Sequence, residues 1–362
     1  MPPERLLRTA HRQDGLITRD QALTAGATPD FIRHAIGPQG RWQRVLPGIY
    51  ATFTGPLADI HRYRAAVLYG GADAMITGAT ACHLHGMKYV PDTDDIDVLV
   101  PHNRQRVDGD FVRLRRTQRM PASVRWIGLD VPDEEVPALL ADDTPDDDDL
   151  TGGAVRWMIP IAPLARAALD AVRFRHQLLL DSNGRMAKST RRKLIQDTRA
   201  LLCETVQRRR VHETALVAEL NGGPRAHSAF ARLAMLDIVA GCRSAPECEL
   251  RDLIRRSKIL PEPRWNRPLP GYPAIRPDAC WPDARLVVEV DSKEWHRFGT
   301  GIERTEQRQA RYAELGWRAV AVSPYRIRTE PNVVRALLER AYLVGAAREG
   351  DIGGVPAPAS SP

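Results

Sequence analysis

Residues 274–298 read AIRPDACWPDARLVVEVDSKEWHRF, and this stretch decides the fold of the C-terminal part of the chain. We expect two strands here, residues 274–281 and 285–291, joined by a tight turn. The second strand contains LVVEV, which is short, apolar and β-branched, as is typical of a strand buried on both faces. Glu289 and Asp291 stand two residues apart, so period-two geometry places both carboxylates on one face of that strand.

The acids of this hairpin indicate metal chemistry. Asp278 lies on the first strand, beside Glu289 and Asp291 on the second. Buried charges are costly unless something neutralises them, and clustered carboxylate oxygens suit a hard cation such as Mg²⁺. An acid on one strand with Glu-x-Asp on the next is what metal-assisted phosphodiester hydrolysis needs, because the cation polarises the phosphate and lowers the pKa of a bound water.

Two further residues are candidates for this chemistry. Glu247, on a preceding helix that we expect to begin at Ser244, is a candidate metal ligand or water-orienting group. His296 follows the second strand and is a candidate acid or base near neutral pH. A structural alternative stays open, in which the acids only form ion pairs with arginines. Its candidates are Arg276, Arg285 and Arg308.

The flanking sequence completes an α/β unit. A helix that carries Arg308 ends at Gly316, the run RAVAVS predicts a strand, and PNVVRALLERAYLV predicts a last helix. Helix, strand, strand, helix, strand and helix in this order predict a three-layer α/β/α arrangement.

On these features, residues 241–347 resemble the very-short-patch-repair-like endonucleases of the PD-(D/E)XK superfamily. The matching features are the Glu247 helix, Asp278, Glu-Val-Asp at 289–291, His296, Arg308 and the closing LGWRAVAVS. The resemblance implies a mixed sheet flanked by helices, a magnesium cofactor, and Asp278 and Glu289 as its ligands. The lysine that is usual in the third motif of the superfamily is replaced by Asp291.

The N-terminal residues predict a DNA-binding module. Thr18 with Gln21 is a capping-box pattern, and Thr28 followed by Pro29 predicts the start of a third helix. The run RWQRVLPGIYATF predicts a hairpin. Capped helices followed by a hairpin are typical of a winged helix-turn-helix. The candidate DNA contacts are Arg33 and His34 on the third helix and Arg41, Trp42 and Arg44 on the hairpin, with Arg308 in the C-terminal domain.

This half of the chain resembles AbiEi-type antitoxins of type IV toxin–antitoxin systems. The segments that carry the resemblance are GLITRDQALTAG, RWQRVLPGIYA and TGATACHLHGM. The resemblance implies a winged helix that binds operator DNA, and a cognate toxin as a further partner.

The whole chain is therefore expected to be an α+β multidomain protein. The expected parts are a winged helix (1–54), a middle α/β unit (55–175), a basic helical connector (176–240), the nuclease-like domain (241–347) and a disordered tail (348–362). Residues 131–150 hold nine acids and no base, and the run Asp146–Asp149 predicts a solvated loop.

Composition is consistent with a protein that binds nucleic acid. The net charge is +7, and five cysteines are scattered without a CxxC pair. We expect a cytoplasmic protein with no membrane segment. Two functions remain open: a magnesium-dependent DNA endonuclease, and an AbiEi-type antitoxin or autoregulator whose nuclease-like domain is inactive. The oligomeric state is also left open.

Overall fold

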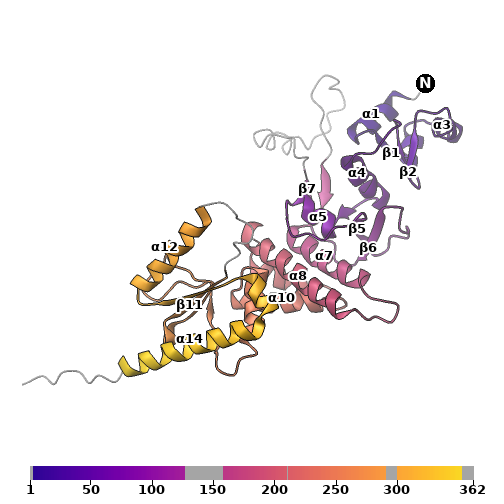
Figure 1. The fold of residues 1–362 in the computed structure, drawn as a ribbon. Helices are drawn as coiled ribbons and strands as arrows, with labels where there is room; N and C mark the ends of the chain where they lie inside the picture. The colour runs from indigo at the N-terminus through magenta and orange to yellow at the C-terminus, as the bar shows by residue number, and fades with distance from the viewer. Residues whose placement is uncertain (1–2, 127–157, 210, 291–299, 353–362) are drawn as a thin grey trace, which may run out of the picture. The chain divides into compact units, whose positions relative to one another are not determined.

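The computed structural model describes residues 3–126, 158–209, 211–290 and 300–352 (Figure 1). The chain divides into two compact units, Met1–Leu179 and Leu180–Pro362. The protein is mixed α/β, and its described residues form three separate sheets. The acidic segment 131–150 lies outside the described residues.

Residues 3–51 contain three helices and a three-stranded sheet. Thr18 caps the second helix through a capping box with Gln21, and Thr28 caps the third helix with Pro29 in its first turn, both as expected. The hairpin is also confirmed, and the sheet has the order β1-β3-β2. The elements are α1 (Glu4–Arg12), β1 (Leu16–Thr18), α2 (Arg19–Thr24), α3 (Pro29–Ala35), β2 (Gln43–Leu46) and β3 (Ile49–Ala51).

A five-stranded sheet forms the rest of the first unit. Its order is β6-β5-β4-β8-β7, with β5 parallel to β6 and β4 antiparallel to β5. A helix of this part of the chain begins directly after Thr77. The elements are α4 (Asp59–Gly70), β4 (Met75–Ile76), α5 (Gly78–Leu84), β5 (Ile96–Pro101), β6 (Val112–Thr117), β7 (Val124–Trp126), β8 (Ile159–Ile161) and α7 (Leu164–Leu178).

Helices that were expected to be a basic connector pack into the second unit. Arg199 is 2% exposed and pairs with Asp237 at 2.7 Å and with Asp252 at 2.7 Å. These ion pairs join three helices, because each partner lies on a different one. The elements are α8 (Lys188–Arg209), α9 (Glu213–Gly222), α10 (Ala229–Ala240) and α11 (Ala245–Ile254).

The second unit also contains a four-stranded mixed sheet of order β12-β11-β10-β9. Strands β10 and β11 are antiparallel, as expected for the hairpin, and β11 is parallel to β12. The strands lie between α12 and α14 in Figure 1. The elements are β9 (Arg264–Trp265), β10 (Ala279–Trp281), η1 (Pro282–Ala284), β11 (Leu286–Val290), α12 (Thr300–Glu314), β12 (Arg318–Val322), α13 (Pro324–Thr329) and α14 (Pro331–Ile352).

Two boundaries differ from the expectation. Strand β10 starts at Ala279 rather than at residue 274, because Pro277 has no N–H to donate to a ladder. Helix α14 continues to Ile352, so residues 348–352 are helical rather than a disordered tail. Gly345 does not end this helix. A Cβ at this position would lie 2.0 Å from the backbone oxygen of Ala284, so glycine permits a close approach.

Within the described part of the chain, no helix is both long enough and apolar enough to span a membrane.

Candidate active site

The β10–β11 hairpin brings two acids together at its open end. Ala279 pairs with Val288 in the antiparallel register, so Asp278 and Glu289 are the next residues along the two strands. The side chain of Asp278 is fixed by a hydrogen bond across the hairpin, in which its Oδ2 accepts the backbone N–H of Val290 at 2.7 Å. Burial raises the pKa of Asp278, while this hydrogen bond and the charge of Arg308 oppose the rise.

Glu289 is held by two side chains of α12. Its Oε1 accepts the hydroxyl of Tyr312 at 2.5 Å and lies 3.2 Å from Nη2 of Arg308. The carboxylate is 16% exposed. Burial raises its pKa to about 7, and the negative charge of Asp278 adds to this rise. Glu289 therefore titrates near neutral pH and stands beside an arginine that is 51% exposed.

Glu247 lies in the first turn of α11, where Ser244 caps the helix as expected. Its Oε1 accepts the Ser244 hydroxyl at 2.7 Å. Its Oε2 accepts the backbone N–H of Arg243 at 2.9 Å and Nδ2 of Asn266 at 2.6 Å. Burial raises the pKa of Glu247 to about 7, with a further contribution from the charge of Asp278.

The three carboxylates form one electrostatic cluster. Asp278 raises the pKa of both glutamates, and Glu247 also raises that of Glu289. A bound divalent cation would reduce this repulsion, because its positive charge would neutralise the carboxylates.

The donor set fits a hard cation in part. Among the described residues, hydrogen bonds engage both oxygens of Glu247 but only one oxygen each of Asp278 and Glu289. Two carboxylate oxygens on adjacent strands are suitable ligands for Mg²⁺. No group of three His, Cys, Asp or Glu side chains in the described ranges is placed to hold a metal ion.

Two predicted catalytic residues cannot be placed. Asp291 and His296 lie in 291–299, outside the described residues. Of the three arginines considered as ion-pair partners, Arg308 contacts Glu289, and its Nη2 also donates to the backbone oxygen of Arg276 at 3.0 Å.

Asn266 and Tyr312 were not expected at this site. Tyr312 follows Arg308 by four residues on α12, so the two share a helix face, and this spacing could have indicated a joint role. Asn266 lies in a loop with a positive φ of 49°, and it reaches Glu247 through a tertiary contact that no sequence pattern indicates.

The predicted DNA contacts at the N-terminus divide into exposed and buried residues. Arg33, His34, Arg41 and Arg44 are exposed, and Arg33 forms an exposed ion pair with Asp30 at 3.0 Å.

Trp42 differs from the prediction, because it is a core residue that is 7% exposed. Its ring packs edge-on against Phe31, with centroids 5.6 Å apart, and lies beside Tyr50. The large apolar indole is buried between the third helix and the hairpin, so it is not available to a phosphate.

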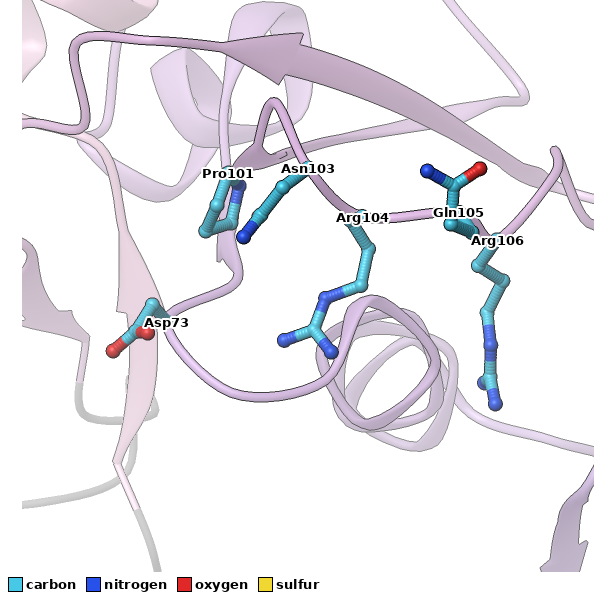
Figure 2. Close-up of a pocket in the computed structure, with 6 residues that line it drawn as sticks. All are labelled: Asp73, Pro101, Asn103, Arg104, Gln105 and Arg106. Carbon is cyan, nitrogen blue, oxygen red and sulfur yellow. The ribbon is translucent and has the colours of Figure 1, made fainter.

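An open hollow lies beside the loop that follows β5 in the first unit, with a volume of about 740 Å³. Figure 2 shows Arg104 and Arg106 pointing to one side of this loop and Gln105 to the other. Arg104 donates to the backbone oxygen of Ala72 and Arg106 to that of Tyr69, so both arginines brace the loop against α4 and the turn after it.

Comparisons with known proteins leave the function open. No protein-family model matches the chain. Two curated relatives are the uncharacterized proteins MT2308 and Rv2248 of Mycobacterium tuberculosis, from strains CDC 1551 / Oshkosh and ATCC 25618 / H37Rv. Each is 36% identical over 99 residues, which cover 27% of this chain and 36% of the relative. The chain therefore matches about a third of the length of these relatives.

A solved structure, the crystal structure of the RV2827C protein from Mycobacterium tuberculosis, is also similar. The match has a TM-score of 0.34 and 19% identity, and it covers 64% of this chain and 75% of that chain.

Proposed function

We propose that this protein binds DNA through its N-terminal helices and hairpin and hydrolyses phosphodiester bonds in its second unit with a divalent cation. One observation carries the catalytic part: Asp278 and Glu289 lie opposite each other at the open end of the β10–β11 hairpin, partly buried, each with one oxygen that no described residue engages.

The side chains divide the work between holding a cation and binding the substrate. Asp278 and Glu289 would hold Mg²⁺, which supplies charge neutralisation at the phosphate and a water of lowered pKa. Tyr312 orients Glu289 through its hydroxyl. Arg308 is half exposed beside the same carboxylate, so its guanidinium can bind a phosphate of the DNA backbone. Glu247 lies near the pair and is itself fixed by three hydrogen bonds.

The winged-helix proposal rests on the N-terminal architecture. Two capped helices precede a β-hairpin, and exposed Arg33, Arg41 and Arg44 lie on the third helix and on the hairpin and its approach. The resemblance of this region to AbiEi-type antitoxins supports the same proposal, as the resemblance of residues 241–347 to very-short-patch-repair-like endonucleases supports the nuclease.

Plasmid cleavage tests the catalytic part. Supercoiled plasmid is incubated with the protein and Mg²⁺ or Mn²⁺, using wild type, Asp278→Asn and Glu289→Gln. We expect cation-dependent nicking in the wild type and its loss in both variants. Asp283→Asn is the matched control, because this exposed acid lies at the opposite end of the same hairpin. Nicking that survives in the site variants would refute the assignment.

The hydrogen bonds and ion pairs of Glu247 and Glu289 favour a second function, in which this site is inactive. Arg308 and Tyr312 already engage Glu289, and hydrogen bonds from protein groups occupy both oxygens of Glu247. The same arrangement is consistent with a catalytically inactive nuclease-like domain in an AbiEi-type antitoxin or autoregulator. It predicts no cleavage, with salt-sensitive DNA binding equal in the wild type and both site variants, and binding of a cognate toxin encoded beside its gene.

A further inference from the structure

A cavity in the first unit is distinct from the site described above. It has a volume of about 390 Å³ and lies between the β5–β6 strands and the C-terminal half of α7. Small-molecule sites have volumes of roughly 300–1,000 Å³. The cavity therefore has the size of a small-ligand site.

Charged groups of both signs line one wall of the cavity. Along β5 and its approach, Asp95 and Asp97 alternate with apolar residues, and Arg113 and Arg115 do the same on the parallel strand β6. The two pairs meet across the strands, with Arg113 to Asp95 at 2.9 Å and Arg115 to Asp97 at 2.7 Å. Period-two geometry thus directs four charged side chains to one face of a sheet.

The pair formed by Arg115 and Asp97 places hydrogen-bond donors beside an acceptor. Arg115 donates only its Nε to Oδ1 of Asp97 within the described residues, so its terminal nitrogens and Oδ2 of Asp97 are not engaged. Burial raises the pKa of Asp97 to about 6, against the lowering effect of Arg115. The guanidinium of Arg115 lies 4.2 Å from the ring centroid of Phe174, which fixes its plane.

Glycine at position 78 lets the backbone pack closely against this pair. Its φ is +63°, and a Cβ there would lie 3.0 Å from Oδ2 of Asp97 and 3.3 Å from Cδ2 of Phe174. Any other residue at this position would crowd Asp97 and Phe174. Phe174, Ala79 and Ala171 give this part of the cavity apolar walls.

We propose that this cavity binds a nucleotide, whose base edge pairs with Asp97 and Arg115 and whose phosphate binds Arg175. A base edge carries an acceptor next to a donor, which matches the guanidinium and the carboxylate side by side. The apolar walls suit the faces of a flat heterocycle. Arg175 also lines the cavity, and no described residue pairs with its guanidinium, so it is free to bind a phosphate.

Two kinds of ligand carry these groups: a free nucleotide, and an unpaired nucleotide within a single strand of nucleic acid. Calorimetric titration of the full chain with AMP, GMP, CMP and UMP, with the matching nucleosides and with short single-stranded DNA distinguishes them. The proposal does not depend on the nuclease. Asp278→Asn and Glu289→Gln proteins are therefore expected to bind as the wild type does.

Three variants test the assignment. We expect Asp97→Asn to weaken binding roughly 10-fold or more, because a charged acceptor is lost. We expect Arg175→Ala to weaken nucleotide binding by a similar factor but to leave nucleoside binding unchanged. Arg192→Ala removes an exposed arginine of α8 as the control for charge. Thermal unfolding shows whether each variant is folded. If Asp97→Asn does not fold, the binding measured with Arg175→Ala tests the proposal.

Binding of single strands alone, with the same dependence on Asp97 and Arg175, supports the site and assigns it to nucleic acid. The proposal is overturned if none of the ligands binds at millimolar concentration. It is also overturned if they bind equally well to the wild type and to both site variants.

Discussion

Glu289→Gln is expected to change how the stability of the second unit depends on pH. Burial and the charge of Asp278 raise the pKa of Glu289 from its ordinary value of 4.5 to about 7. Between these two values the folded protein keeps the proton and the unfolded chain releases it. The contribution of Glu289 to stability is therefore fully present below pH 4.5, falls as pH rises, and is lost above about pH 7.

The size of this effect follows from the pKa. A difference of one in the pKa between the folded and unfolded protein corresponds to about 1.4 kcal/mol, so Glu289 removes about 3 kcal/mol of unfolding free energy between acidic pH and pH 8. Glutamine is neutral throughout, and its carbonyl oxygen can still accept the Tyr312 hydroxyl. The pKa of about 7 already includes the opposing effects of Tyr312 and Arg308, so the lost ion pair is not subtracted again. We therefore expect the variant to be more stable than the wild type by about 3 kcal/mol at pH 8.

Hydrogen exchange of the β10 and β11 amides, analysed by mass spectrometry in metal-free buffer across a pH series, measures this difference within the second unit. Exchange rates are first corrected for intrinsic pH dependence. The gain in stability must grow with pH and level off above neutrality. A difference between the two proteins that is the same at pH 5 and pH 8 would show that Glu289 does not titrate as its burial requires.

Three further predictions concern other parts of the chain. Trp42→Ala is expected to destabilise the N-terminal module by about 3–5 kcal/mol, measured by urea unfolding, whereas a surface tryptophan would cost far less. Gly345→Val should lower the melting temperature of the second unit, because its Cβ would overlap the Ala284 backbone oxygen, and an unchanged value would contradict the close approach. Arg44→Ala should weaken DNA binding and reduce the salt slope by about 1 in a binding series, and an unchanged slope would exclude a phosphate contact.

Local signals predicted the helices and the hairpins well. Thr18, Thr28 and Ser244 cap the helices that they were expected to cap, because a side-chain oxygen three residues before a free N–H is a local arrangement. The antiparallel pairing of β10 with β11 follows from the tight turn between them, which also brings Asp278 beside Glu289.

Other features depend on contacts that are distant in sequence. Helix α14 continues through Gly345, and glycine there allows the Ala284 backbone to approach the helix closely. Trp42 stands between two charged or polar neighbours in a basic hairpin, but the third helix covers its ring. Neither outcome can be predicted from neighbouring residues, because each is determined by an element elsewhere in the chain.

The sequence by itself determined which acids could act together, since Asp278 and Glu289 are brought together by one hairpin. Only the tertiary structure decided what surrounds them: Tyr312 and Arg308 from α12, and Asn266 beside Glu247. The pairing of strands in a hairpin depends on the backbone conformation of the few residues in its turn. Burial and its effect on pKa depend on packing between elements, where separate segments exclude water from the same carboxylates.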